Sequence, residues 1–292
     1  MKCFYHNDID GYCAAAIVAR YTSDYDKNDY IEYSYSSPLP LEKINPGETV
    51  YFVDLSFSLN TINELKKIIN ELNCDLIWCD HHTSSIEMLA KNPEYEKIKG
   101  IRTSEFSGAA LTWMYFENCK FNECPYFVQL VSDFDCWKFE FANTMYFKYA
   151  LESNDISPLS NVWNKLFRDD QINGNPMLRN MIKEGKIIEK YMIQWNENYC
   201  KQYSYESEID GIKCLVCNIR ANSLLFGDLI NDYPLVAIWV CDGNQYKYSI
   251  YSNKEDIDCS KIAEKFGGGG HKGASGFVST ELILKNKQLE EK

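Results

Sequence analysis

The chain of 292 residues carries 42 acidic and 30 basic side chains, which gives a formal net charge of −12. This acidity argues against a long track along duplex nucleic acid, which needs many Lys and Arg residues facing phosphates. Hydrophobic residues make up 45% of the chain and no apolar stretch approaches a membrane span, so we expect a soluble globular protein with room for two domains. The N-terminal stretch MKCFYHNDID has no apolar signal core, and we expect a cytoplasmic protein.

The twelve cysteines are too sparse for a disulfide scaffold in a chain of this length. Cys3, Cys79 and Cys241 fall inside apolar runs, where a free thiol behaves as a small core residue. Cys214 and Cys217 form a CxxC motif, but IKCLVCNI is typical of a buried strand and no second Cys or His pair lies near enough to complete a zinc site. We therefore predict reduced, structural thiols.

Three strand-like segments in the first half of the chain lead into acidic or histidine residues. They are KCFYH before Asn7, TVYFV before Asp54 and DLIWC before Asp80. Continuous apolar runs suit strands that are buried on both faces, as in a parallel sheet. The helical stretches GYCAAAIVARY and LNTINELKKIINEL alternate with them. The alternation predicts an open, mainly parallel α/β domain over residues 1–180, with the strand C-termini meeting at one crevice.

The second half of the chain changes character twice. The pattern over residues 105–200 is helical, and residues 181–205 predict a helical linker with apolar residues at helical spacing. Beyond it, IKCLVCNI and PLVAIWVCDGNQYKYSIYS indicate strands, DCSKIAEKF a helix and FVST a further strand. We therefore predict a smaller α+β domain over residues 206–292.

The stretch HNDIDG places His6, Asp8 and Asp10 at alternate positions where the first strand ends. In an extended conformation these three side chains point the same way. An imidazole and two carboxylates gathered in this way are candidate metal ligands, because without a cation they would repel one another. The alternative is that Asp10 caps a helix that begins at Gly11.

The other two strand ends carry similar groups. Asp54 follows VYFV, where the simple alternative is a turn residue that closes the strand. Asp80, His81 and His82 follow DLIWC, and two adjacent histidines behind an aspartate are harder to explain as turn residues. Half of the four histidines of the chain lie in this one stretch.

A further pair of aspartates, Asp133 and Asp135, alternates in the stretch LVSDFDCWKF. With the strand ends, the chain then offers too many candidate ligands for one structural zinc ion. They are His6, Asp8, Asp10, Asp54, His81 and Asp133. Such a set suits two divalent ions about 3.5–4 Å apart that share a bridging carboxylate. Oxygen and nitrogen ligands without thiolate favour Mn²⁺, with Mg²⁺ or Co²⁺ as the alternatives.

Six of the fifteen glycines fall within residues 267–276, GGGGHKGASG. Backbone amides at Gly268, Gly269 and Gly270 could approach phosphate oxygens closely. His271 stands among them, whereas a flexible linker, the alternative, would not normally carry a histidine between apolar elements. Arg220 is a further candidate for substrate binding, with a surface role as its alternative.

The set HNDIDG, VD, DHH and SDFD, followed by FGGGGHKGASGF, resembles the DHH phosphoesterase superfamily. That superfamily includes RecJ-type exonucleases, nanoRNases, pAp phosphatases, cyclic-dinucleotide phosphodiesterases and family II pyrophosphatases. The motifs occur in the family's order and extend over nearly the whole chain. The glycine-histidine stretch is similar to the signature of the C-terminal DHH-associated domain. The resemblance implies an active site in the cleft between the two domains.

The resemblance also implies a role for each motif residue. One ion would be held by His6, Asp8 and Asp54, and the other by Asp10, Asp54, His81 and Asp133, with Asp54 bridging. His82 would face the substrate phosphate in catalysis, and Asp80 would orient a histidine from behind. His271 would bind a substrate phosphate. Asp135 is the alternative to Asp133, which would then support it.

This constellation predicts phosphodiester hydrolysis by a water that two metal ions activate. Family II pyrophosphatases carry a different C-terminal domain and RecJ-type enzymes usually carry further domains, so we favour short oligonucleotides degraded to 5′-mononucleotides. The alternatives are a cyclic or linear dinucleotide phosphodiesterase, a pAp phosphatase or, in another class, a non-catalytic nucleotide-binding module. We expect neither a membrane nor long duplex nucleic acid as a partner, and the sequence leaves a homodimer open.

Overall fold

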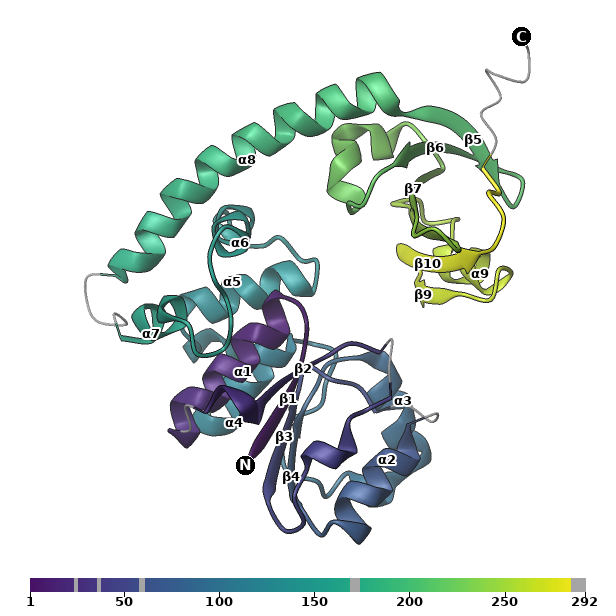
Figure 1. Cartoon of the computed structure of the whole chain (residues 1–292). Coiled ribbons are helices and arrows are strands. Elements are labelled where there is room, and N and C mark those ends of the chain that lie inside the picture. Colours follow the sequence, from purple (N-terminus) through teal and green to yellow (C-terminus); the bar gives the residue numbers. More distant parts are fainter. Residues whose placement is uncertain (24–25, 36–37, 58–60, 169–173, 285–292) are drawn as a thin grey trace. The chain divides into compact units, whose positions relative to one another are not determined.

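The computed structural model describes residues 1–284 apart from residues 24–25, 36–37, 58–60 and 169–173 (Figure 1). The chain divides into two compact units, Met1–Glu189 and Lys190–Lys292, and each is described by itself. The division falls inside the long helix α8 (Pro176–Tyr203). Within the described residues, no helix combines the length and apolarity that a membrane span requires.

A parallel sheet with the strand order β2-β1-β3-β4 forms the centre of the first unit. Its strands are β1 (Lys2–His6), β2 (Tyr30–Tyr33), β3 (Thr49–Val53) and β4 (Asp75–Cys79). Val53 pairs with Tyr5 on one side and with Cys79 on the other, and all three strand pairings are parallel. The residues that follow β1, β3 and β4 therefore begin at one edge of the sheet. The predicted parallel α/β domain is confirmed, whereas β2 was not predicted.

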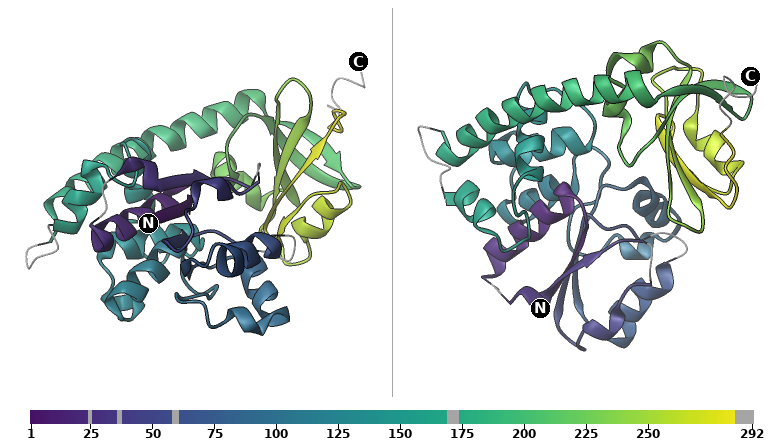
Figure 2. Two further views of the ribbon diagram at one scale, coloured as in Figure 1. Left: turned by 60° about the horizontal axis from the view of Figure 1, so that its bottom comes forward. Right: turned by 45° about the horizontal axis from the view of Figure 1, so that its top comes forward.

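Helices cover both faces of this sheet (Figures 1 and 2). One face carries α1 (Ile9–Thr22), α4 (Gly108–Glu117) and α5 (Tyr126–Asp135), with α6 (Thr144–Glu152) and α7 (Asn161–Arg168) beyond them. The other face carries α2 (Ile62–Lys66), a π-helical turn (Lys67–Glu71) and α3 (Thr83–Lys91). Short 3₁₀ turns lie at Lys27–Asp29, Leu41–Lys43, Pro93–Tyr95 and Phe121–Glu123.

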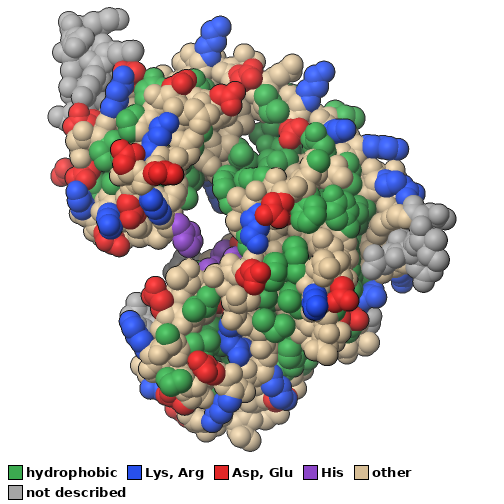
Figure 3. All heavy atoms as spheres, turned by 180° about the vertical axis from the view of Figure 1, so that it is seen from behind, with side chains coloured by type: hydrophobic (Ala, Val, Ile, Leu, Met, Phe, Trp, Pro, Cys, Tyr) green, Lys and Arg blue, Asp and Glu red, His purple; other side chains and the backbone are tan. Residues whose placement is uncertain are grey.

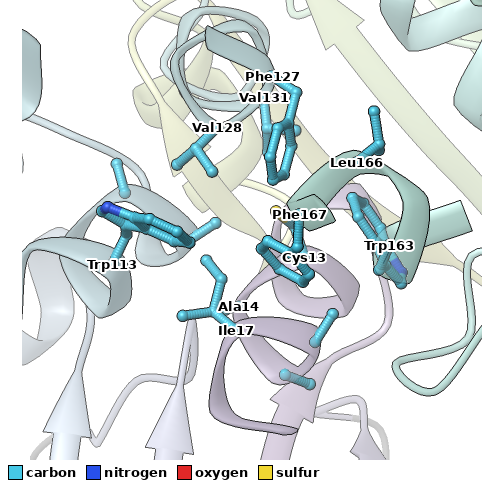
Figure 4. Close-up of a cluster of buried hydrophobic side chains, with 14 of the residues drawn as sticks. Cys13, Ala14, Ile17, Trp113, Phe127, Val128, Val131, Trp163, Leu166 and Phe167 are labelled. Atoms are coloured by element: carbon cyan, nitrogen blue, oxygen red, sulfur yellow. The ribbon is translucent and has the colours of Figure 1, made fainter. Parts of the chain in front are cut away.

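The larger core of the first unit packs α1 against α4, α5 and α7 (Figure 4). Small side chains on α1, among them Ala14, let the aromatic residues of the neighbouring helices approach closely. Trp163 and Phe127 are each 1% exposed. Burial of one such side chain is worth roughly 1.5–3 kcal/mol, so this cluster holds the helices that carry the candidate ligands in place.

A mixed sheet with the strand order β5-β6-β7-β8-β10-β9 forms the second unit among the described residues. Its strands are β5 (Tyr205–Ile209), β6 (Ile212–Asn218), β7 (Leu235–Cys241), β8 (Tyr246–Tyr251), β9 (Gly269–His271) and β10 (Ala274–Ser279). A 3₁₀ segment (Ser223–Asn231) and α9 (Cys259–Glu264) complete it. This α+β arrangement confirms the fold class expected for the C-terminal part.

The CxxC motif lies in β6, and both thiols are fully buried. Cys214 packs in the core on one face of the sheet with Val216, and Cys217 packs in a second core with Leu215. Because side chains alternate along a strand, residues three apart point to opposite faces. Cys214 and Cys217 cannot hold one ion together, and the interpretation as core residues is confirmed.

Candidate metal centre

The carboxyl ends of β1, β3 and β4 bring the predicted ligands of the first half of the chain together. His6 is the last residue of β1, Asp54 follows β3 directly, and His81 and His82 lie just beyond β4. Among the described residues, three overlapping groups of side chains have metal-ligating atoms within 4.8 Å of one another. They are His6 with Asp8 and Asp54, Asp54 with His81 and His82, and His81 with Asp135 and Cys136. The side chains of His6 and His82 are 24% and 29% exposed. Figure 3 shows histidine side chains at the surface of the molecule.

The residue that caps α1 is Asp8, whereas the sequence suggested Asp10 for that role. Asp8 Oδ1 accepts the N–H of Gly11 at 2.9 Å, and Asp8 Oδ2 lies 2.5 Å from His6 Nδ1. Burial alone would raise the pKa of Asp8, but the hydrogen bond and charge of His6 outweigh it and lower that pKa. A Cβ at Gly11 would lie 2.1 Å from the carbonyl oxygen of His6, so α1 can begin this close to β1 only with glycine.

Asp10 lies inside the first turn of α1, so the expected extended alternation of three side chains is wrong. The carboxylate turns instead to the N-terminus of α4, where it accepts the N–H groups of Gly108 at 2.7 Å and Ala109 at 3.0 Å. Asp10 is 1% exposed, and burial raises its pKa, with the charge of His81 acting in the opposite direction. The positive end of the α4 dipole stabilises this carboxylate.

Asp54 is the central residue of the cluster. Its side chain is buried, its backbone is left-handed at φ 55°, and neither of its oxygens has a hydrogen-bond partner among the described residues. Oδ1 lies 3.2 Å from His81 Nε2, and Oδ2 lies 3.8 Å from His6 Nδ1. Burial, followed by the charges of Asp10 and Asp8, raises the pKa of Asp54 well above its usual value.

A divalent cation fits this arrangement, because a buried carboxylate without a hydrogen bond is costly unless a positive charge compensates it. Asp54 faces an imidazole on each side, so its two oxygens could serve two ions. Asp135 Oδ2 is the third buried oxygen of the cluster that lacks a hydrogen-bond partner among the described residues, after the two of Asp54, and it lies 3.2 Å from His81 Nε2. The donors are oxygen and nitrogen atoms, with the sulfur of Cys136 beside them.

The structure brings Asp135, and not Asp133, into this group of ligands. Both residues lie on α5, where positions two apart point in nearly opposite directions. Asp133 Oδ1 accepts the N–H of Glu140 at 2.9 Å, and Oδ2 accepts from the N–H of Phe141 at 3.2 Å and from the Thr144 hydroxyl. Through these contacts Asp133 holds the segment that follows α5. This position differs from the role of metal ligand that the sequence predicted for Asp133.

His81 is strongly affected by the acidic groups around it. Burial alone would lower its pKa, but Asp54, then Cys136 and the charges of Asp10 and Asp135 raise it to about 12. Burial, followed by the charge of Asp10, raises the pKa of Asp135 well above its usual value. Without a cation, this corner of the cluster therefore retains protons that a metal ion would have to displace.

His82 is held by Asp80. Its Nδ1 lies 2.7 Å from Asp80 Oδ1, while Asp80 Oδ2 accepts from the hydroxyl of Ser85. Asp80 is fully buried, which alone would raise its pKa, but the hydrogen bond and charge of His82 lower it. The predicted arrangement of an aspartate that orients a histidine thus has a structural counterpart in this pair.

Two residues near the centre were not singled out as candidates from the sequence. The ring of Tyr35 lies 5.7 Å from that of His6 and 6.4 Å from that of His82, and its hydroxyl accepts the N–H of Ser56 at 2.7 Å. Tyr35 follows β2, so its position depends on a strand that the sequence did not reveal. The other residue is Cys136. The sequence feature that could have pointed to it is its position directly after Asp135, a candidate ligand.

The remaining predicted residues belong to the second unit. The glycine stretch is not a linker, since Gly269–His271 forms β9 and pairs with β10. The N–H of Gly268 donates to Ala263, and a Cβ there would lie 2.1 Å from the carbonyl oxygen of Gly276, so close packing accounts for this glycine. A Cβ at Gly269 would meet nothing within 4 Å. His271 and Arg220 are exposed, and their predicted roles stay predictions.

The fold of the chain is that of the DHH-domain proteins, which confirms the resemblance seen in the motifs. It is similar to the solved structure of a pGpG-specific phosphodiesterase from Vibrio cholerae, with 12% identity and a TM-score of 0.53 over 96% of this chain and 94% of the other. It is also similar to the DHH domain of a protein from a family of ribosomal proteins, with 15% identity and a TM-score of 0.53 over 99% and 83%.

No protein-family profile matches the chain. Among curated proteins, it is 28% identical over 252 residues to the uncharacterized protein R106 of Acanthamoeba polyphaga mimivirus, which covers 82% of this chain. The chain spans about half the length of that relative, 54%.

Proposed function

We propose that the first unit is a divalent-metal-dependent phosphoesterase centre, and that its substrates are short oligonucleotides cleaved to 5′-mononucleotides. The observation that carries this proposal is Asp54, a buried carboxylate with both oxygens unpartnered among the described residues and an imidazole on each side. A bridging carboxylate between two ions has these requirements. The DHH fold supports the proposal.

Two sets of side chains would hold the ions, with Asp54 common to both. The sets are His6, Asp8 and Asp54 for one ion, and Asp54, His81 and Asp135 for the other, where His81 Nε2 lies 3.2 Å from an oxygen of each aspartate. Asp10 stays a predicted ligand, because an oxygen that accepts one N–H retains a second lone pair. Asp133 becomes a positioning residue, which holds the segment after α5 through its three hydrogen bonds.

When bound, the two ions would supply Lewis acidity toward phosphate oxygens and a water of lowered pKa. The chain itself orients the substrate side of the centre. Asp80 holds His82 through Nδ1, which leaves Nε2 as the nitrogen for a phosphate oxygen. A histidine fixed by a buried carboxylate can stabilise negative charge at phosphate without first reorienting. His271 stays the predicted phosphate contact from the second unit.

A linear dinucleotide is the second candidate substrate. The likeness to a pGpG-specific phosphodiesterase over 96% of this chain favours it, although at 12% identity the likeness itself concerns the fold. Cyclic dinucleotides and pAp are further candidates, and a non-catalytic nucleotide-binding role is the competing class.

The test is a substrate panel with the metal-free protein to which Mn²⁺ or Mg²⁺ is added back. The panel contains labelled di- to decanucleotides of RNA and DNA, linear and cyclic dinucleotides, pAp and pyrophosphate. We expect mononucleotide release from the short oligonucleotides, lost in Asp54→Asn and retained in Asp75→Asn, where the aspartate pairs with Lys99 at the surface. Release of product from none of these substrates would contradict the proposal and favour the binding module.

A further inference from the structure

Cys136, like Tyr35, lies near the centre and has no role in the proposed function. It caps the C-terminus of α5, directly after Asp135, and its N–H donates to the carbonyl oxygen of Ser132 at 2.9 Å. The thiol is half-buried, unlike the fully buried thiols of Cys3 or Cys79. Its sulfur and the ligating atoms of His81 and Asp135 all lie within 4.8 Å of one another.

The carboxylates in this corner point independently to a cation beside the thiol. His81 Nε2 lies 3.2 Å from Asp54 Oδ1 and 3.2 Å from Asp135 Oδ2. Asp54 is 1% exposed, and these two oxygens lack a hydrogen-bond partner among the described residues. The sulfur of Cys136 therefore lies beside two donor groups, those of His81 and Asp135, and the same nitrogen of His81 also faces Asp54.

We propose that Cys136 is a further ligand in this corner and donates a thiolate to the ion that His81, Asp135 and Asp54 would hold. The thiol proton would leave to solvent when the ion binds. This inference rests on the metal pair of the proposed function. With this ligand the two metal sites differ chemically. The site formed by His6, Asp8 and Asp54 offers only nitrogen and oxygen ligands, whereas the other site adds a sulfur.

A thiolate changes which ions the corner prefers. Sulfur ligands favour softer ions such as Zn²⁺ and Cd²⁺ over Mg²⁺ and Mn²⁺, whereas carboxylates and imidazoles accept the harder ions. The His81–Asp135–Cys136 corner should therefore bind Cd²⁺ and Co²⁺ with a direct metal–sulfur bond. The loss of sulfur should weaken Cd²⁺ binding far more than Mn²⁺ binding.

The test is an absorption titration of the reduced, metal-free full chain with Co²⁺ and with Cd²⁺, alongside calorimetry with the same ions. Wild type should develop a thiolate-to-metal charge-transfer band in the near ultraviolet. At saturation, the absorbance of this band should correspond to one metal-bound thiolate per chain. Cys136→Ser should lose the band and bind Cd²⁺ at least about tenfold more weakly, while its Mn²⁺ affinity changes less. Cys241→Ser, which removes an exposed thiol of the second unit, should keep the band.

Two results would overturn the inference. Binding of Co²⁺ and Cd²⁺ without a charge-transfer band in wild type, or a band that persists in Cys136→Ser, would remove Cys136 from the ligands and leave the proposed phosphoesterase intact. If calorimetry detects no divalent ion bound to the wild-type chain, the inference and the proposed metal pair fail together. The spectroscopic readout needs no substrate, so these failures are distinguishable.

Discussion

Gly108, the first residue of α4, packs directly on Asp54. A Cβ at position 108 would lie 2.5 Å from the Cβ of Asp54 and 2.8 Å from its Cα. The same glycine donates its N–H to Asp10 at 2.7 Å. The N-terminus of one helix thus fixes the positions of two carboxylates of the centre, and it can do so because residue 108 lacks a side chain.

Gly108→Ala should therefore displace Asp54 and weaken divalent metal binding. We expect a loss of folding stability of about 1–3 kcal/mol, as for other overpacked sites. A larger effect should appear in the Mn²⁺ affinity that calorimetry measures on the folded protein. Gly185→Ala is the matched control, since its Cβ would meet the carbonyl oxygen of Tyr146 at 1.7 Å in a different contact. Equal Mn²⁺ affinities in the two variants would contradict the role given to Gly108.

Substitution of the two aspartates of α5 should separate metal binding from stability. Asp135→Asn should lower Mn²⁺ affinity and leave the Tm of the metal-free protein unchanged or higher, because a neutral amide replaces a buried carboxyl group that lies near the charge of Asp10. Asp133→Ala should instead lower the Tm. Loss of its three hydrogen bonds should cost at least about 3 kcal/mol, or roughly 6–12 °C. A large loss of affinity with unchanged Tm in Asp133→Ala would restore Asp133 as the ligand.

Metal binding should release protons, and affinity should rise with pH. The pKa of His81 is raised to about 12, and the pKa values of Asp54 and Asp135 are raised above the usual range, so the metal-free cluster retains protons near neutral pH. Because a ligating imidazole must be neutral, the ion displaces at least roughly one proton per chain. Calorimetry of Mn²⁺ binding in buffers of different ionisation enthalpy measures this release. Identical binding enthalpies in all buffers would count against it.

The Asp80–His82 pair should control turnover more than metal affinity. Asp80→Asn keeps the shape of the side chain but removes the charge that fixes His82, and we expect the hydrolysis rate to fall about 10–100-fold. Ser85→Ala removes the other hydrogen bond to Asp80 and should have a smaller effect on rate. The measurement is the ratio of kcat to Mn²⁺ affinity in each variant. A fall in affinity equal to the fall in rate would assign the pair to metal binding.

In the second unit, Gly269→Ala and Gly268→Ala should have different effects. A Cβ at Gly269 meets nothing within 4 Å, whereas one at Gly268 collides with the backbone of Gly276. Gly268→Ala should therefore lower the Tm. Gly269→Ala should keep the Tm and raise KM if the backbone at Gly269 approaches substrate.

His271→Ala should likewise raise KM without altering Mn²⁺ affinity, and unchanged kinetics would remove His271 from the substrate contacts.

Local sequence patterns were sufficient to predict the parallel sheet and the meeting of its strand ends. The apolar runs before Asn7, Asp54 and Asp80 are strands, and parallel strands present their carboxyl ends at one edge. Strands β2 and β5 were missed because Tyr30–Tyr33 and Tyr205–Ile209 are short and interrupted by acidic residues. Their pairing depends on neighbours distant in sequence.

The details of the centre depended on backbone geometry that motifs do not specify. Asp133 and Asp135 alternate in the sequence as they would on a strand, but on a helix two positions apart means nearly opposite faces. Asp10 was expected to share a face with His6, but the helix begins one residue before it and turns its carboxylate to α4. The types of residue that could bind a metal were predictable from chemistry, whereas the direction in which each side chain points required the structure.

The left-handed backbone at Asp54 restricts what else could occupy this position. Most L-residues lose roughly 1–2 kcal/mol in that conformation, whereas aspartate and asparagine enter it with less difficulty. Alanine at position 54 would thus combine the loss of a ligand with backbone strain, so its effects on folding and on chemistry could not be separated. Asparagine preserves both the shape and the backbone, which makes Asp54→Asn the variant suited to trapping an uncleaved substrate.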